Sequence, residues 1–511
     1  MAQQSAAPGA AQSDPTDPTP PAQAGAGPQP ATGDAGQPGQ VDLSGLGADF
    51  VWGAATSSFQ IEGDADGRGR SIWDDLCDVP GAITDGSHGR TACDHVHRYA
   101  EDVRLMRDLG VGAYRFSIAW PRVMPSGTGR PDPAGLAFYD RLVDELLAAG
   151  ISPWVTLYHW DLPSPLQTDL GGWASREIVP RFADYAVAVH AALGDRVRHW
   201  ATLNEPWCSA WLGYGSGEHA PGIRDHGQAA RAAHHLLLAH GEAIRAMRAQ
   251  APADHELGIV LNLFPLRPSP RLTGREAAEV GEITRLMDGV QNRWWLDALF
   301  EGHYPRDVTD RLSAALDGVV RDGDLERIGA PLDFLGVNYY SDQYYLPAQQ
   351  PGPADSGAYP GAALVTSEDP GPDATTMGWP VTPDGLHDIL LRIGRAYPAA
   401  PPLVVTENGA AYPDDPAAVA AAVDGTAVAD PMRVRYLRAH LAAVARAVRD
   451  GADVRGYFAW SLLDNFEWAH GYTQRFGLVR VDFDSLQRRP RRSYEVYRDA
   501  IAAHRGGFPR D

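Results

Sequence analysis

The sequence predicts an α/β fold, a single (β/α)8 TIM barrel with long loops after its strands, preceded by a disordered N-terminal tail. Three observations lead to this prediction. Eight short apolar runs are spread along the chain, stretches with helical spacing separate them, and polar or aromatic residues follow almost every run. The runs are apolar almost throughout, as in parallel strands that are covered on both faces. Eight strand–helix units in one chain favour a closed barrel.

The predicted strands begin near residue 50 and end at residue 460. They span residues 50–55, 113–119, 153–158, 199–203, 257–264, 333–337, 403–405 and 456–460. Between them, apolar side chains recur at helical spacing over 96–109, 136–147 and 432–444, which predicts amphipathic helices. Two long segments between predicted strands, 206–256 and 341–402, interrupt the alternation of strands and helices. Segments of that length are usually functional rims or disordered.

The first 40 residues differ from the rest of the chain. After Met1 they contain no large apolar residue and consist of Ala, Pro, Gly, Gln, Ser, Thr and Asp. Such a segment cannot bury enough apolar surface to order itself. It also lacks the basic start and the apolar core of a signal peptide. We therefore expect a disordered tail over 1–40 and one catalytic barrel domain over 41–511.

The composition limits which binding partners and which cellular compartment we expect. The chain of 511 residues has 44 basic and 65 acidic side chains, a formal net charge of −21. This charge argues against nucleic acid and against an anionic membrane surface as partners. The three cysteines, Cys77, Cys93 and Cys208, are too few and too scattered for a disulfide framework, and no apolar run approaches the length of a membrane span. We expect a cytoplasmic protein, either a monomer or a homo-oligomer.

Several kinds of chemistry are excluded by absent residues. The sequence contains no lysine, so mechanisms that depend on a lysine Schiff base or a phosphate-binding lysine are ruled out. It has no G-x-S-x-G elbow of a serine hydrolase and no H-E-x-x-H zinc motif. No strand is followed by a G-x-G-x-x-G turn. We expect neither a metal nor an organic cofactor.

Carboxylates are the remaining candidates for catalysis. Glu205 directly follows the fourth predicted strand, and Glu407 directly follows the seventh. Barrel enzymes place catalytic groups at these strand ends, where the two carboxyl groups would face one pocket. Cleavage of a glycosidic bond needs such a pair, with one member protonated and the other ionised. Each glutamate alone could instead form an ion pair with an arginine, and Arg115 on the second strand is a possible partner for either.

The residues around the two glutamates suit an uncharged polyol. They combine amides, one histidine and a carboxylate for hydroxyl groups with indole faces for apolar ring surfaces. The polar members are Gln60, His159, Asn204 and Glu467, and the indoles are Trp160, Trp460 and Trp468. Without lysine, such a set suits a phosphate or a nucleotide badly.

Six segments resemble the signature motifs of glycoside hydrolase family 1 β-glucosidases. They are residues 50–63 (FVWGAATSSFQIEG), 114–120 (YRFSIAW), 158–161 (YHWD), 202–206 (TLNEP), 406–409 (TENG) and 460–468 (WSLLDNFEW). The resemblance extends from about Phe50 to Tyr497 and leaves out the tail. It implies the barrel fold and a retaining mechanism, with the acid/base and the nucleophile on strands 4 and 7.

The resemblance also implies residue roles. Glu205 is similar to the general acid/base and Glu407 to the nucleophile. Arg115, Asn338 and Tyr340 match residues that orient the nucleophile or bond nearby. Gln60, His159, Trp160, Asn204, Glu467 and Trp468 match the set that binds the terminal sugar, the glycone, and Trp460 forms the floor of that subsite. Trp379 resembles an aglycone platform and Phe476 an aromatic near C6 of the sugar. Trp207, Cys208, Trp211, Leu212 and His219 are expected either to line the entrance or to pack within their loop.

The implied activity is hydrolysis of terminal non-reducing β-D-glucosyl residues in cellobiose, oligosaccharides and aryl β-glucosides, with side activity on β-galactosides and β-fucosides. Members of the family that act on 6-phosphoglycosides lack the residue that Glu467 matches and use a lysine, so phosphorylated substrates are not expected. Two alternatives remain. One is a transglycosylase or a glycosidase with a narrow aglycone, and the other is a sugar-binding protein without turnover, against which the retention of Glu205 and Glu407 argues.

Overall fold

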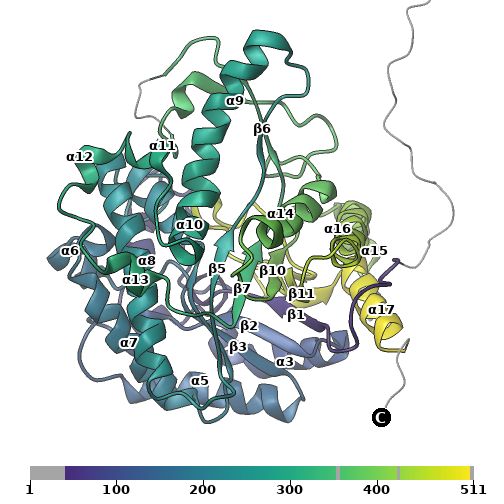
Figure 1. The fold of residues 1–511 in the computed structure, drawn as a ribbon. Helices are drawn as coiled ribbons and strands as arrows, with labels where there is room; N and C mark the ends of the chain where they lie inside the picture. Colours follow the sequence, from purple (N-terminus) through teal and green to yellow (C-terminus); the bar gives the residue numbers. More distant parts are fainter. Residues whose placement is uncertain (1–40, 353–356, 423–425, 507–511) are drawn as a thin grey trace, which may run out of the picture. The chain divides into compact units, whose positions relative to one another are not determined.

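The computed structural model describes residues 41–352, 357–422 and 426–506 (Figure 1). The tail predicted over 1–40 lies outside the described residues. Its disorder, and the division of the chain at residue 40, therefore stay predictions.

Eight parallel strands close into a barrel in the order β1-β11-β10-β7-β5-β4-β3-β2. The strands are β1 (Val51–Ala55), β2 (Ala113–Ser117), β3 (Ser152–Tyr158), β4 (His199–Asn204), β5 (Glu256–Asn262), β7 (Phe334–Asn338), β10 (Leu403–Asn408) and β11 (Val454–Trp460). β1 pairs with both β2 and β11, so the first strand and the last strand close the ring. The predicted (β/α)8 barrel and all eight predicted strands are confirmed.

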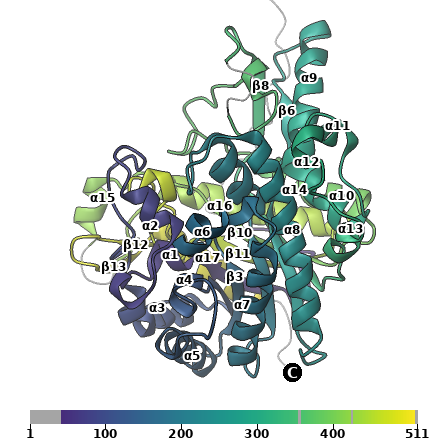
Figure 2. The same ribbon diagram turned by 90° about the vertical axis from the view of Figure 1, so that its left-hand side faces the viewer.

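Helices surround the barrel on its outside (Figures 1 and 2). The longer ones are α3 (His95–Leu109), α5 (Pro133–Ala148), α7 (Ile178–Leu193), α8 (His226–Arg248), α14 (Pro383–Ala396), α16 (Pro431–Arg449) and α17 (Arg492–Gly506). Shorter ones are α1 (Ser58–Ile61), α2 (Ile72–Cys77), α4 (Trp120–Val123), α6 (Ser164–Leu170), α10 (Trp294–Phe300), α11 (Arg306–Thr309), α12 (Ser313–Leu316), α13 (Asp324–Ile328) and α15 (Pro416–Ala421). The three stretches predicted from helical spacing are α3, α5 and α16.

Local sequence signals explain where these helices begin and end. α5 starts with Pro133 at its first position, and the side chain of Asp132 accepts a hydrogen bond from the backbone N–H of Ala134. A proline at the first turn costs no helical hydrogen bond, and an aspartate cap satisfies one of the open N–H groups. α3 ends at Gly110, whose φ of 81° is the left-handed conformation that glycine adopts without strain.

Aromatic side chains fill the middle of the barrel. The ring of Trp154 packs against Phe334 and Phe458, with ring centroids 5.3 and 5.2 Å away. Gly53 leaves room for these rings, because a Cβ atom there would lie 2.2 Å from the ring of Phe458. The barrel interior is therefore a packed core, as is usual for this fold, and a binding site has to form at one end.

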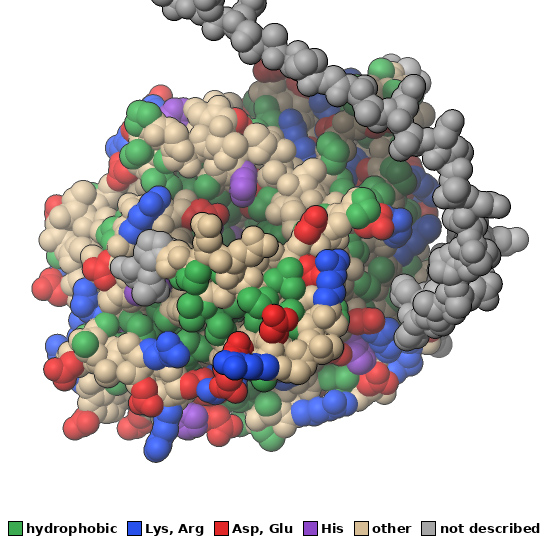
Figure 3. Space-filling model, turned by 90° about the horizontal axis from the view of Figure 1, so that it is seen from above, with side chains coloured by type: hydrophobic (Ala, Val, Ile, Leu, Met, Phe, Trp, Pro, Cys, Tyr) green, Lys and Arg blue, Asp and Glu red, His purple; other side chains and the backbone are tan. Residues whose placement is uncertain are grey.

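Additional elements build a rim at the carboxyl ends of the strands. β6 (Leu266–Pro268), β8 (Gln343–Pro347) and β9 (Val365–Ser367) form a small sheet next to α9 (Gly274–Asp288), and they project upward in Figures 1 and 2. A second small sheet pairs β12 (Val479–Val481) with β13 (Arg488–Pro490). Seen from above in Figure 3, hydrophobic side chains gather near the centre of this face.

The two long segments differ in content. The segment 341–402 contributes β8, β9 and α14, whereas 206–256 is mostly helical, with a π-helix over Cys208–Ser216 followed by α8. Among the described residues, no helix combines the length and the apolar character that crossing a bilayer requires.

Candidate active site

A cavity of about 310 Å³ opens at the carboxyl ends of the barrel strands. Both predicted catalytic glutamates, Glu205 and Glu407, lie in its wall. The wall also contains His159, Trp160, Asn338, Tyr340, Trp379, Trp460, Glu467, Trp468 and Phe476 from the predicted site. The remaining predicted residues, Gln60, Arg115 and Asn204, are buried directly behind the wall, where each hydrogen-bonds a residue in it.

Glu407, at the end of β10, has a donor on each carboxyl oxygen. Arg115 Nη1 donates to Oε1 at 2.7 Å, and the Tyr340 hydroxyl donates to Oε2 at 2.6 Å. Burial raises the pKa of Glu407, while the Arg115 charge and the Tyr340 hydrogen bond oppose that shift. Because both donors stabilise the charged form, this carboxyl group is the one that the site prepares for ionisation. The ion pair that the sequence left open for either glutamate thus belongs to Glu407.

Glu205, directly after β4, has no cationic partner among the described residues. Asn338 Nδ2 donates to its Oε1 at 2.7 Å, and the Cys208 thiol donates to its Oε2 at 3.2 Å. Burial, followed by the negative charge of Glu407, raises the pKa of Glu205 to about 8. The environments of the two glutamates therefore push their pKa values apart, the arrangement that separates an acid from a nucleophile.

The backbone is irregular where it presents these groups. The pairing register of β4 shifts between Ala201 and Asn204, and that of β10 shifts between Val405 and Glu407. Such irregularities commonly aim side chains at active sites.

Positive φ angles also gather in the cavity wall. Trp160, Glu205 and Trp468 have φ of 78°, 43° and 46°, although none of them is glycine. Residues in this region cost of order 1–3 kcal/mol each and cluster at functional sites.

A chain of hydrogen bonds fixes the polar groups between the two glutamates. Arg115 Nη2 donates to Asn204 Oδ1 at 2.6 Å, so the amide nitrogen of Asn204 faces His159 Nε2 at 3.0 Å. Burial, and then the Arg115 charge, lowers the pKa of His159 well below its usual range. The imidazole is therefore neutral, accepts at Nε2 and carries its proton on Nδ1, which has no partner among the described residues.

Beside His159, the cavity wall combines a carboxyl group with indole rings. Gln60 Nε2 donates to Asn465 Oδ1 at 3.0 Å and reaches Glu467 Oε2 at 3.4 Å. Burial, followed by the charges of Glu407 and Glu205, raises the pKa of Glu467 to about 8. Trp160 and Trp468 lie beside this group, with ring centroids 4.5 Å apart. Indole faces next to hydroxyl-binding groups are suited to a sugar ring.

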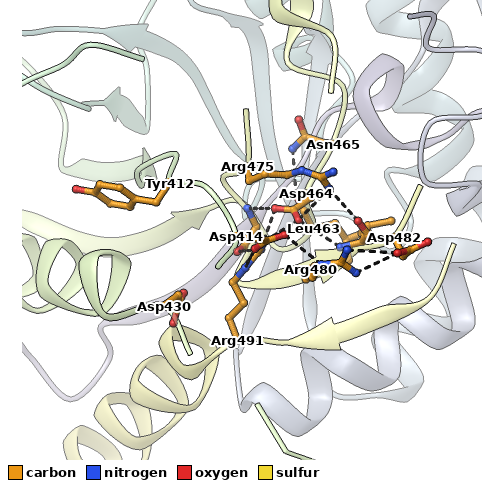
Figure 4. Close-up of polar contacts among 12 residues, drawn as sticks. Tyr412, Asp414, Asp430, Leu463, Asp464, Asn465, Arg475, Arg480, Asp482 and Arg491 are labelled. Atoms are coloured by element: carbon orange, nitrogen blue, oxygen red, sulfur yellow. Dashed lines mark hydrogen bonds and ion pairs between the residues drawn. The ribbon is translucent and has the colours of Figure 1, made fainter. Parts of the chain in front are cut away.

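An ion-pair network supports the loop after β11, which carries Glu467. Asp464 is fully buried, and Arg491 donates to its two oxygens at 2.9 and 2.8 Å (Figure 4). Arg475 approaches the same carboxylate at 3.4 Å. Arg491 also donates to Asp414, which lies on the loop after β10. The network therefore connects the loops that follow the two strands, β10 and β11, and holds them in one arrangement.

The entrance differs in part from the expectation. Trp207, Cys208, Leu212 and His219 line the cavity as the resemblance implies. For Trp211 the structure supports the alternative of packing: its side chain is fully buried and packs against His226 of α8, with ring centroids 5.6 Å apart. The helical segment that follows Glu205 turns this indole toward α8 and away from the cavity.

Sequence reasoning missed several wall residues. They are Glu218, Asn262, Phe264, Ser341, Gln343, Tyr345, Tyr359, Met377 and His470. Most of them come from the rim or its flanking loops and belong to no motif. Asn262 ends β5, so the polar strand-end signal that found the other residues could have found it too.

Among the described residues, no group of three or more His, Cys, Asp or Glu side chains is arranged to hold a metal ion.

The fold and the cavity define a barrel enzyme with a buried pair of carboxyl groups. The chain matches the model of glycosyl hydrolase family 1 over residues 44–506. It is 48% identical over 457 residues to a thermostable beta-glucosidase B of Thermobispora bispora, covering 88% of this chain and 89% of that protein. It is 46% identical to a bifunctional beta-D-glucosidase/beta-D-fucosidase of Bifidobacterium breve, covering 89% of this chain and 98% of that protein.

Comparison with solved structures indicates the same family as the comparison of sequences. The structure of a psychrophilic beta-glucosidase from Micrococcus antarcticus matches with a TM-score of 0.83 at 44% identity, covering 90% of this chain and 98% of that one. The chain therefore belongs to glycosyl hydrolase family 1. The resemblance read from the sequence motifs is confirmed.

Proposed function

We propose that the protein is a retaining β-glycosidase that hydrolyses terminal non-reducing β-D-glucosyl residues of cellobiose, oligosaccharides and aryl β-glucosides. The observation that carries the proposal is the unequal pair of carboxyl groups in one cavity. Glu407 has a cation and a hydroxyl donor, whereas Glu205 has neither and its pKa is raised to about 8. Relatives that are 48% and 46% identical to this chain are named as β-glucosidases.

In the first step of the proposed mechanism, Glu407 attacks the anomeric carbon. Glu205 donates its proton to the glycosidic oxygen, which keeps the electron pair of the breaking C–O bond as the aglycone leaves. The product is an α-glycosyl ester on Glu407. Arg115 and Tyr340 keep the nucleophile ionised before the attack and hold it in place.

In the second step, water attacks the anomeric carbon of the ester. Glu205, now ionised, takes a proton from the water, and the electron pair of the ester bond returns to Glu407. Burial and then the negative charge of Glu407 raise the pKa of Glu205, and esterification removes that charge, so Glu205 can act first as an acid and then as a base. Two displacements at the same carbon retain the β configuration.

The glycone subsite suits an uncharged hexose. Glu467 and His159 bring polar side chains to the wall, Gln60 hydrogen-bonds Glu467 from behind it, and Trp460 and Trp468 offer apolar faces. Among the described residues that line the cavity there is no arginine, and the sequence has no lysine, so neither of these cations is available in the wall as a partner for a phosphate group. We extend the proposal to β-fucosides, because one relative is named for that activity, and to β-galactosides.

The two alternatives from the sequence have less support. A sugar-binding protein without turnover has no need for the separate environments of Glu205 and Glu407. A narrow aglycone or transglycosylation would depend on the rim, where no observation favours either. The cytoplasmic location and the oligomeric state stay predictions.

The test uses p-nitrophenyl β-glucoside with the wild type and Glu407→Gly. We expect hydrolysis by the wild type, no turnover by the variant, and restored turnover with azide that yields α-glucosyl azide. An inactive wild type would favour a narrow-aglycone enzyme or a sugar-binding protein. A variant that turns over unaided would remove Glu407 from the role of nucleophile.

A further inference from the structure

The hydrogen bonds around Glu205 distinguish its two carboxyl oxygens. The Thr406 hydroxyl donates to Asn338 Oδ1 at 2.7 Å, which turns Asn338 Nδ2 toward Glu205 Oε1. An amide N–H can only donate, so Oε1 has to accept in both protonation states of the glutamate. The exchangeable proton of Glu205 therefore resides on Oε2.

Cys208 lies against this second oxygen. Its sulfur is 3.2 Å from Glu205 Oε2, and Asn262 Nδ2 lies 3.5 Å from the same sulfur. The backbone N–H of Cys208 donates to the carbonyl oxygen of Glu205 at 2.9 Å, which closes the turn that brings the two side chains together. The thiol is buried and forms part of the cavity wall.

We propose that Cys208 is a positioning residue for the acid/base: its thiol hydrogen-bonds the oxygen of Glu205 that carries the catalytic proton, and the direction of that hydrogen bond reverses as Glu205 alternates between acid and base. The inference rests on the proposed role of Glu205. It adds a residue whose side chain hydrogen-bonds the acid/base and, among the described contacts, forms no hydrogen bond to Glu407.

A thiol is suited to this reversal because it donates weakly and accepts weakly. Before the first step Oε2 bears the proton, and the sulfur offers it only a weak acceptor, so the proton remains available to the glycosidic oxygen. After the transfer Oε2 is anionic, and the S–H group donates to it. In the second step the proton from water returns to Oε2. The thiol neither gains nor loses a proton in the cycle, because burial, and then the charge of Glu205, raises the pKa of Cys208 well above its usual range.

Other charged groups act on the same pair of side chains. Glu407, Glu467, Tyr340 and Arg115 interact electrostatically with Glu205. Glu218, after the π-helix, acts on Cys208 together with the two glutamates of the site. A substitution at position 208 leaves all of these groups in place. A change in the titration of Glu205 between variants at this position can therefore be assigned to the thiol.

The test compares variants without a donor, Cys208→Ala and Cys208→Val, with Cys208→Ser, which keeps one. Alanine leaves a space that water can enter, whereas valine fills it, so agreement between the two excludes an effect of a void. Cys77→Ala is the matched control, since it removes the same atoms from a buried thiol outside the cavity wall. Circular dichroism and thermal unfolding establish that each variant is folded.

Two pH profiles report the pKa of Glu205 in different states. The basic limb of kcat/KM for p-nitrophenyl β-glucoside reports the free enzyme, where Glu205 must be protonated. The acid limb of the reactivation rate of an enzyme trapped as its 2-deoxy-2-fluoroglucosyl ester reports the intermediate, where Glu205 must be ionised. A lost donor to the carboxylate raises the pKa in both states. We expect both limbs to move to higher pH by about 0.5–1 unit in the variants without a donor.

The serine variant should keep both limbs within about 0.2 unit of the wild type, since its hydroxyl restores a donor, and Cys77→Ala should match the wild type. The inference is overturned if Ala and Val leave the limbs in place, or if Ser shifts them as far. Glu205→Ala separates this failure from that of the proposed function. If this variant still hydrolyses p-nitrophenyl β-glucoside with the wild-type basic limb, the acid/base role itself is wrong.

Discussion

The hydroxyl group of Tyr340 offers a direct test of how the site keeps Glu407 ionised. It donates to Glu407 Oε2 at 2.6 Å, while Arg115 holds the other oxygen. Tyr340→Phe removes this one donor and keeps the ring, which packs 5.5 Å from Trp379 and 5.9 Å from Phe476 between centroids. The substitution therefore changes the electrostatics of Glu407 with little change in the shape of the cavity.

The magnitude follows from the charge of the acceptor. A hydrogen bond to an ionised group contributes about 1.5–3 kcal/mol, and one pKa unit corresponds to about 1.4 kcal/mol. Losing the Tyr340 hydroxyl should thus raise the pKa of Glu407 by about 1–2 units. Because the nucleophile must be ionised, the acid limb of kcat/KM moves to higher pH by the same amount. At pH values below the acid limbs of both enzymes, kcat/KM of Tyr340→Phe should be about 10- to 100-fold lower than that of the wild type.

The assay measures kcat/KM for p-nitrophenyl β-glucoside across the acid limb. Tyr339→Phe is the matched control: its hydroxyl contacts Asp342 and Thr382, away from the glutamates, so its acid limb should stay in place. The reasoning is refuted if Tyr340→Phe shows a uniform loss of activity with an unshifted limb, because the hydroxyl would then not act through the charge of Glu407.

Three further predictions concern the supporting residues. Asn204→Ala should lower kcat/KM at least about tenfold, equal to about 1.4 kcal/mol, and wild-type kinetics in the purified variant would contradict this. Asp464→Asn removes the charge that neutralises a buried arginine and should lower the free energy of unfolding in urea by about 3–5 kcal/mol, whereas the more exposed Asp482→Asn should cost less than about 1 kcal/mol. Burial lowers the pKa of His240 to about 3 and that of His440 to about 4, so the unfolded chain binds more protons below about pH 6.5. The contribution of these histidines to stability should be complete above that pH and be lost as the pH drops toward 4, with a smaller slope in His240→Gln, and equal slopes in that variant and the wild type would show that this histidine is not the cause.

The sequence predicts the barrel well because its strands are buried on both faces. A strand such as Val454–Trp460 therefore appears as a nearly continuous apolar run, and its aromatic end, Trp460, marks the site. The same rule located Glu205 and Glu407 without any knowledge of their contacts. The strand-end rule could not predict which glutamate pairs with Arg115. That pairing depends on how the arginine side chain, which comes from β2, extends across the end of the barrel.

The rim is the part that the sequence does not predict. Tyr345 and Tyr359 reach the cavity from a sheet and a loop whose positions depend on pairing between β6 and β8, far apart along the chain. No local spacing encodes such a contact, and single aromatic residues in a loop have no signature. Trp211 shows the reverse problem: a resemblance places it near the entrance, but the packing of α8 decides which way its ring faces.

Glu205 and Glu407 differ in ionisation because the site contains little positive charge. Three carboxyl groups, those of Glu205, Glu407 and Glu467, lie in the cavity wall, and Arg115 behind that wall forms an ion pair with Glu407. At neutral pH the other two stay largely protonated, so the resting site is close to neutral and suits an uncharged sugar. In the proposed cycle, ester formation removes the charge of Glu407 and leaves Arg115 without a counter-charge. The arginine, which also bonds Asn204 next to Glu205, then favours ionisation of Glu205 at the moment when a base is required. One cation thus supports the nucleophile in the first step and the base in the second.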